Sequence, residues 1–489
     1  MTSTSKKVGE KLITEIVQPN VSNFIKSLRD IGYTFEVAVA DVLDNSITAK
    51  AKNIHIYCVP SPNTTFAMLD DGSGMSTSEL VDAMRLAAND PDKAREGSDL
   101  GKFGLGLKTA SFSQCTNLTV LSKKNGSVSI KQWDLEYISR ENEWFLITPD
   151  INEYRNIPLF DEFIQQDNGT LVVWQGIDTF TESDIPLKVD SLRDHLSLVF
   201  HCFLEGIVPG QKALRIFVNG QQLNPFNPFN PKHIATQQLM TEKIKYLDSE
   251  IRVEPYILPH HSKLSQQEFE KYATNEGYTK SQGFYLYRAH RLLIHGTWWG
   301  MHRASDAHKL VRIKIDIPNN QDFAWGIDIK KSSANPVSEI KKDLKRIIEQ
   351  VTVKGSRPFT GRGRKIEDKT TTRFWELVAE NNEIHFVINR EHPILKDMES
   401  KLDQSQQHLL NVILMGLESY LPLDAIVAQL NINPKKVKQE TLINEDEIKI
   451  LVENWRRSGV SETFIKELLK TEIYKNKETY FDNASSGRD

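Results

Sequence analysis

Residues 70–75, with the sequence DDGSGM, constrain this chain more than any other feature of its sequence. They follow a short apolar run, residues 66–69, which predicts a buried strand. An Asp at the end of a strand can accept a hydrogen bond from an exocyclic amine, and the two glycines let backbone approach a flat base. The same hexapeptide can be an ordinary surface turn, because Asp-Gly turns are common. Three other segments bear on that choice.

The first segment is a helix predicted over residues 35–50, which contain neither Gly nor Pro. Asp41 and Asn45 are four residues apart, so they lie on one face of this helix. A carboxamide oxygen can ligate Mg²⁺, and a carboxylate can orient a water molecule for attack on a terminal phosphate. Asn45 is therefore the candidate metal ligand and Asp41 the candidate catalytic residue. The alternative is a solvated helix face with neither role.

The second segment is residues 101–111, GKFGLGLKTAS, in which three glycines precede a predicted helix. Glycines at a helix start expose backbone N–H groups to an anion, and Lys108 adds a positive charge. The sequence is not the P-loop, which has Gly-Lys-Ser/Thr after a strand. The third segment is Gly169-Thr170, before the apolar run 171–174. Thr170 can reach the aspartate and a base through a water molecule, although alone this pair indicates a strand-starting turn.

In this order and at these intervals, the four segments resemble the ATP-binding domain of the GHKL superfamily. The superfamily contains gyrase B, heat-shock chaperones, histidine kinases, MutL and the MORC proteins. The resemblance covers roughly residues 20–180 and implies a Bergerat-type α/β sandwich that binds ATP and Mg²⁺. It implies that Asp70 binds the adenine amine, that Thr170 supports Asp70 and that Asn45 binds Mg²⁺. The residues that it places around the nucleotide are Asn45, Asp70, Gly72, Gly74, Met75, Gly101, Lys102, Phe103, Gly104, Leu105, Gly106, Leu107, Lys108 and Thr170.

The chain departs from the superfamily at Asp41, where the relatives carry a catalytic Glu. The shorter side chain withdraws the carboxylate by about one methylene, and a misplacement of ~1 Å can lower a rate on the order of a hundredfold. We therefore expect an ATPase that hydrolyses ATP slowly and uses ATP binding largely as a switch.

The sequence predicts an α+β chain in four parts. These are an ATP-binding domain with an N-terminal arm (1–185), a transducer-like α+β domain (186–350), a basic flexible linker (351–370) and a helical C-terminal region (371–489). A mobile lid is expected over residues 88–98. The second part is expected to open with a helix over 189–204 and a strand over 214–218. In the last part the expected helices are 372–381, 398–419, 422–430, 444–457 and 461–476.

The transducer domain of gyrase and MutL supplies a lysine to the γ-phosphate from a loop after a strand. Residues 325–332, WGIDIKKS, resemble that arrangement, with an alternating strand followed by two lysines. Lys330 and Lys331 are therefore candidate catalytic residues, and the sequence does not choose between them. Two solvated lysines at the start of a helix are the alternative.

The pair Trp298-Trp299 lies near several arginines, among them Arg288 and Arg291. Aromatic side chains beside arginines can stack on nucleic-acid bases. We favour a core position, because large aromatic side chains are highly buried on average.

Composition limits the function classes. A chain of 489 residues exceeds the size of one core, and a net charge of −4 leaves nucleic-acid binding to a local patch. Residues 354–369 are such a patch, with six basic and two acidic side chains. Three scattered cysteines fit a reducing cytoplasm. No apolar run approaches ~20 residues and the N-terminus has no signal-peptide core, so no membrane association is expected.

Two short segments, Leu43-Asp44-Asn45 and residues 102–108, look most similar to prokaryotic MORC-like proteins, which are associated with DNA restriction and antiviral defence. The resemblance implies an ATP-gated homodimer that acts as a clamp on DNA, with an effector protein as a further partner. A non-hydrolysing nucleotide sensor and a chaperone-like clamp on a protein partner are the alternatives. A histidine kinase fits poorly, because the first histidine, His55, lies inside the ATP-binding domain itself.

Overall fold

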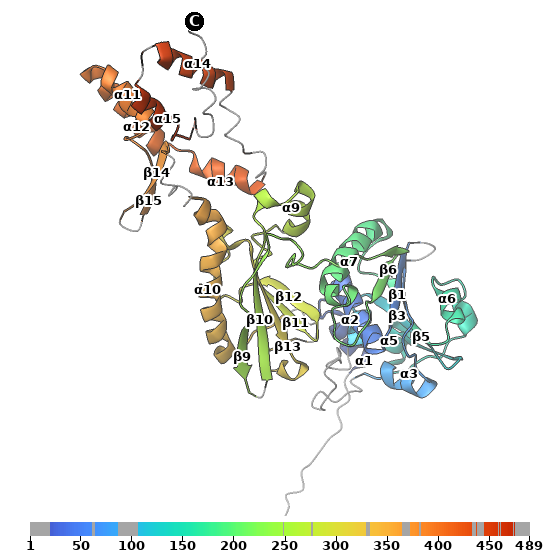
Figure 1. The fold of residues 1–489 in the computed structure, drawn as a ribbon. Helices are drawn as coiled ribbons and strands as arrows, with labels where there is room; N and C mark the ends of the chain where they lie inside the picture. Colours follow the sequence, from blue (N-terminus) through green and yellow to red (C-terminus); the bar gives the residue numbers. More distant parts are fainter. Residues whose placement is uncertain are drawn as a thin grey trace, which may run out of the picture.

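The computed structural model shows three units arranged in a row, each with its own sheet (Figure 1). The residues it describes are 20–60, 64–86, 106–247, 249–274, 277–328, 333–363, 372–380, 383–432, 437, 445–457, 459, 461–472 and 474. The predicted N-terminal arm up to residue 19, the predicted lid, Gly101 to Leu105, and both Lys330 and Lys331 lie outside them.

The first unit is built on a seven-stranded sheet in the order β4-β3-β5-β2-β1-β6-β7. Its strands are β1 (Asn53–Val59), β2 (Thr65–Asp70), β3 (Cys115–Lys124), β4 (Ser127–Asp134), β5 (Gly169–Ile177), β6 (Arg215–Val218) and β7 (Gln221–Gln222). Every neighbouring pair is antiparallel except β1 with β6, which is parallel. This mixed sheet with packed helices confirms the predicted α+β class.

Both faces of this sheet are covered, which explains the continuous apolar run of β2. Phe66 and Met68 pack with the main helical layer, whereas Ala67 and Leu69 pack with α6 and the chain before it. The helices of the unit are α1 (Val21–Arg29), α2 (Phe35–Thr48), α3 (Thr77–Met84), α4 (Gly106–Phe112), α5 (Leu135–Glu141), α6 (Phe160–Gln165), α7 (Ile185–Val199) and α8 (His201–Leu204). The cysteines Cys58, Cys115 and Cys202 are buried free thiols of this unit.

The first unit extends beyond the boundary that the sequence suggested at residue 185. Helix α7 packs on α2, and β6 pairs with β1 over residues 53–56. The segment 189–218 therefore belongs to the first unit, although the prediction assigned it to the second part. The pairing joins positions about 160 residues apart, and such a long-range parallel contact leaves no local pattern in a sequence.

The second unit contains a sheet in the order β12-β11-β13-β10-β8, with β9 also paired to β10. Its elements are β8 (Gln237–Gln238), β9 (Glu242–Tyr246), β10 (Ser249–Ile257), α9 (Gln266–Ala273), β11 (Gly283–Arg288), β12 (Arg291–Thr297), β13 (Val311–Ile317) and α10 (Ser338–Gly363). Trp298 is buried in this core, and the ring of Trp299 stacks on Phe284. The core position favoured for the tryptophan pair is confirmed for Trp298, and Trp299 is partly buried against the same core.

Two expectations for this unit were wrong. Residues 322–326 form turns instead of the strand expected before the two lysines, because Trp325 is buried in the core and its backbone bonds to Gln321 and Asn335. Helix α10 continues to Gly363, so residues 351–363 of the predicted flexible linker are helical.

The third unit holds β14 (Trp375–Glu380), β15 (Glu383–Ile388), α11 (Pro393–Lys401), α12 (Gln404–Ser419), α13 (Leu423–Ile432), α14 (Glu445–Arg457) and α15 (Glu462–Leu468). The helix expected over 372–381 is instead β14, which pairs along its whole length with β15. Helix α12 exposes large apolar side chains, including Leu409, Val412, Ile413 and Leu417.

Within the described ranges, no single helix has the length and apolar character of a membrane span. The bent pair of α12 with residues 423–430, with an angle of 43°, meets that test by length and composition alone.

Candidate functional site

A cavity of about 750 Å³ opens in the first unit beside α2, at the ends of strands β2 and β5. Of the residues predicted to surround a nucleotide, Gly72 and the segment 101–105 are not part of the described lining. The others do line it, and with their neighbours the lining is Val42, Asn45, Ser46, Ala49, Met68, Asp70, Ser73, Gly74, Met75, Asp82, Ala83, Arg85, Gly106, Leu107, Lys108, Val120, Thr170 and Val172.

Asp70 is the buried acidic group of this cavity. It is the last residue of β2 and pairs with Thr170 of β5. Its Oδ2 accepts a hydrogen bond from the Ser46 hydroxyl (2.7 Å), and its Oδ1 accepts one from the Gly72 N–H (2.9 Å). Burial raises the pKa of Asp70 to about 6, although these hydrogen bonds oppose the rise. The result is a fixed acceptor that titrates close to neutral pH.

The two glycines of this motif are required by protein packing. A Cβ on Gly72 would lie 2.8 Å from the Cβ of Ala49, and one on Gly74 would lie 1.9 Å from the carbonyl oxygen of Lys123. Gly74 also has a φ of +63°. The sequence prediction gave a different reason for these glycines, the approach of a base, and of the two only Gly74 lines the cavity.

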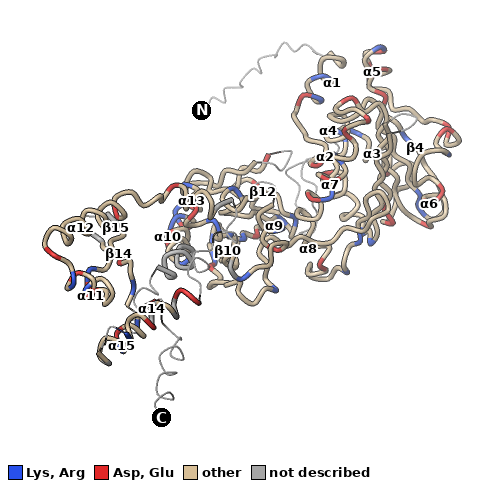
Figure 2. The backbone as a smooth tube through the Cα atoms, turned by 90° about the horizontal axis from the view of Figure 1, so that it is seen from above, with Lys and Arg blue, Asp and Glu red and all other residues tan. Residues whose placement is uncertain are grey.

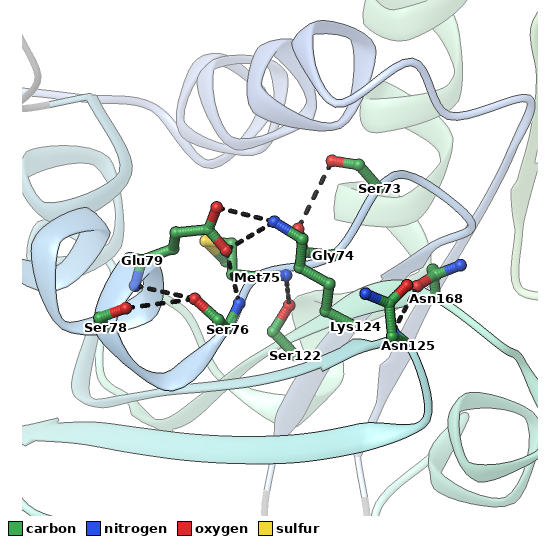
Figure 3. Close-up of polar contacts among 10 residues, drawn as sticks. All are labelled: Ser73, Gly74, Met75, Ser76, Ser78, Glu79, Ser122, Lys124, Asn125 and Asn168. Carbon is green, nitrogen blue, oxygen red and sulfur yellow. Dashed lines mark hydrogen bonds and ion pairs between the residues drawn. The ribbon is translucent and has the colours of Figure 1, made fainter.

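A small hydroxyl network holds the turn after Asp70 against β3 (Figure 3). The Met75 N–H donates to Ser122 Oγ (2.9 Å), and that hydroxyl also lies 3.0 Å from the hydroxyl of Thr170. In the first turn of α3, which follows, Glu79 forms an ion pair with Lys124 (2.7 Å). Ser122 and Ser46 were not predicted as site residues, because neither lies in a recognisable motif.

Asn45 reaches the cavity from the last turns of α2. Its amide nitrogen donates to the backbone oxygens of Asp41 (3.3 Å) and Val42 (3.2 Å). This leaves the Oδ1 atom as the one that can bind a cation. No cluster of three or more His, Cys, Asp or Glu side chains suited to a metal exists among the described residues. A single oxygen ligand matches Mg²⁺, which usually keeps several waters and takes substrate phosphates as ligands.

Lys108 lines the same cavity from the first turn of α4. Its Nζ donates to the backbone oxygen of Ala83 (2.9 Å), at the end of α3. Burial lowers its pKa to about 8. The lysine therefore joins α3 to α4 and keeps a cationic group at the cavity wall.

Asp41 lies on α2 but outside the lining of the cavity. Its side chain is 1% exposed, and its Oδ1 accepts a hydrogen bond from Arg291 of β12 (3.0 Å). Its Oδ2 accepts one from the hydroxyl of Tyr33 (3.1 Å). The structure thus brings together Asn45, Asp70, Lys108 and Thr170, and it places Asp41 in a buried ion pair beside them.

Comparison with known proteins agrees with this geometry. Residues 33–170 match the family described as "Histidine kinase-, DNA gyrase B-, and HSP90-like ATPase". The chain is also similar to the ATPase morc-1 of Caenorhabditis elegans, with 31% identity over 108 residues. That match covers 22% of this chain and only 12% of the length of the relative. The predicted resemblance to GHKL and MORC-like ATPases is therefore confirmed for the first unit.

Proposed function

We propose that this protein binds ATP with Mg²⁺ in the cavity of the first unit and hydrolyses it slowly. The observation that carries the proposal is the convergence of four separate segments on one cavity of ATP size. In this arrangement Asp70 binds the adenine amine, Thr170 supports it, and Lys108 lies near the phosphates. Asn45 is the protein ligand for Mg²⁺, which supplies charge neutralisation at the phosphates.

We also propose that Lys330 or Lys331 reaches the terminal phosphate. Both lysines lie outside the described residues, but the chain just before them can be located. The pKa of Tyr33 is raised by burial first, then by the charge of Asp41 and, among further causes, by that of Asp328. Asp328 is therefore near Tyr33, and residues 330 and 331 are the second and third residues after it in the sequence.

For the wider role we propose an ATP-dependent homodimer that closes as a clamp on DNA, in restriction or antiviral defence with an effector protein. The resemblance to MORC proteins supports this role. Figure 2 shows acidic and basic residues interspersed along all three units, so DNA contact requires a local surface.

Measurements of molar mass and of phosphate release test the proposed clamp. We expect the molar mass to double with a non-hydrolysable ATP analogue and DNA to stimulate phosphate release, more strongly at low salt. A constant mass in every nucleotide state would contradict gating by ATP.

A second candidate is a nucleotide-sensing switch that does not hydrolyse ATP. The ion pair of Asp41 with Arg291 favours it, because a carboxylate engaged with a guanidinium is a poor base for water. Binding of ATP without release of phosphate, with and without DNA, is the result that would select this candidate.

Nucleotide affinity is expected to fall as the pH drops below about 6. The pKa of Asp70 is raised from its ordinary value of 3.8 to about 6 in the folded protein. Protonation of this carboxyl therefore stabilises the fold fully below pH 3.8, and the stabilisation is lost as the pH rises through 6. The adenine amine needs the carboxylate, so the apparent Kd should rise about tenfold for each pH unit below 6. Calorimetry from pH 5 to 8 measures this change. Because phosphates also titrate near pH 6, adenosine is the control, and a flat adenosine profile would contradict the assignment.

A further inference from the structure

The β11–β12 hairpin of the second unit carries a buried arginine onto helix α2 of the first unit. Arg288 and Arg291 face each other across a two-residue turn, Ala289-His290, whose residues have φ of +46° and +67°. Asn-Gly usually occupies such a turn, because positive φ is unfavourable for residues with larger side chains. Backbone strain of this kind persists only where surrounding contacts hold it.

One set of those contacts is made by the guanidinium of Arg291, whose side chain is 5% exposed. Its Nη2 donates to Asp41 (3.0 Å) and its Nε donates to Asp44 (2.8 Å). The ring of Phe200 lies 5.7 Å from its central carbon. One cation from the second unit therefore bridges two carboxylates that are three residues apart on α2.

Both carboxylate oxygens of Asp41 accept a hydrogen bond from a buried protein group. One carboxylate oxygen accepts from Arg291 and the other accepts from Tyr33. His195 lies near Arg291. Its pKa is lowered to about 3 by burial and by the charges of Arg291 and His295, so it adds no positive charge at neutral pH. Asn45, one turn further along α2, meanwhile lines the cavity. The candidate base and the candidate metal ligand thus stand on the same helix in different environments.

We propose that Arg291 is a positioning residue that withholds Asp41 from the nucleotide, so that hydrolysis requires the β11–β12 hairpin to move off α2. This inference rests on the proposed function and on the role predicted for Asp41 from the sequence, which is to orient the attacking water. It makes the second unit a brake on turnover: ATP binds in the cavity whether or not the ion pair is closed, and hydrolysis proceeds only when the pair opens.

The test is the double variant Arg291→Gln/Asp44→Asn in the full chain. It removes one buried cation and one buried anion, so the net charge of the cluster is unchanged and Asp41 keeps an amide donor. Without the guanidinium, Asp41 accepts a proton from water more readily. We expect kcat to rise about tenfold or more, up to the limit of roughly 10²–10⁴-fold that a general base contributes, while the Kd for ATP stays within about twofold.

The matched control is Arg288→Gln/Asp322→Asn. This pair is the other buried ion pair of the same hairpin (2.8 Å) and contacts the second unit instead of α2. We expect its kcat to equal that of the parent. An unchanged or lower kcat in Arg291→Gln/Asp44→Asn, with thermal unfolding and ATP affinity like those of the control, would overturn the inference. A merely structural contact would not raise kcat.

A third variant distinguishes a failure of this inference from a failure of the proposed function. Adding Asp41→Ala to Arg291→Gln/Asp44→Asn should abolish the gain, because the arginine acts through Asp41. A gain that persists without Asp41 overturns the inference. If Asp41→Ala alone leaves the parent rate unchanged, the proposed role of Asp41 fails, and absence of ATP binding in every variant contradicts the proposed function itself.

Discussion

Replacing Asp70 with Asn is expected to weaken ATP binding about a hundredfold while the fold survives. The amide carries no charge, so the adenine amine loses a charge-assisted hydrogen bond of about 1.5–3 kcal/mol. The fold tolerates the change, because the amide oxygen can still accept from Gly72 and the Ser46 hydroxyl can turn to accept from the amide nitrogen. Calorimetric titration with ATP and a thermal unfolding curve measure the two quantities separately.

The adjacent aspartate provides the control for this experiment. Asp71 accepts hydrogen bonds from the backbone of Lys52 and Asn53 and does not line the cavity. Asp71→Asn should therefore lower the unfolding temperature and leave ATP affinity within about twofold. Equal affinities for Asp70→Asn and the parent protein would remove Asp70 from the binding site.

Replacing Gly74 with Ala is expected to reduce the stability of the first unit by more than about 3 kcal/mol. The new methyl group would lie 1.9 Å from the carbonyl oxygen of Lys123 and 3.2 Å from the backbone nitrogen of Gly169. Both neighbours are sheet backbone, in β3 and β5, so neither can move without breaking the sheet. Denaturant unfolding followed by circular dichroism measures the loss.

Gly126→Ala separates the steric clash from backbone strain. Gly126 has a similar φ, +78°, but no atom lies within 4 Å of the position of its Cβ. Its substitution should cost only the left-handed conformation, about 1–2 kcal/mol. Equal losses for the two alanine variants would show that Gly74 is needed for its φ alone and not for its contact with β3.

The sequence was sufficient to locate the nucleotide motifs but not the contacts that act on them. Asp70 could be placed because a strand followed by Asp and two glycines is a local pattern. The ion pair of Arg291 with Asp41 could not be predicted, because it joins residues 250 positions apart. The local sequence around an arginine in a strand does not indicate which acidic residue it will contact. The serine hydroxyls around Asp70 were missed for the same reason.

The third unit shows how local preference misled the prediction. Residues 375–380, WELVAE, are rich in helix formers, yet they form β14. Their pairing with β15 determines the outcome, because strand stability depends mainly on the partner across the sheet. The predicted helices 422–430 and 444–457 agree with α13 and α14, where no such partner competes among the described residues.

The three buried cysteines can serve as probes of local unfolding in this chain. Cys58 and Cys115 lie in the first sheet, whereas Cys202 lies in α8, where the neighbouring His201 ring nitrogen is 2.8 Å from the hydroxyl of Tyr287 in β11. Burial raises the pKa of the Cys58 thiol to about 11 and that of Cys202 to about 12, so a thiol reagent reacts only after local unfolding exposes them. The order in which they are labelled therefore tells whether the junction with the second unit loosens before the sheet does, and whether ATP changes that order.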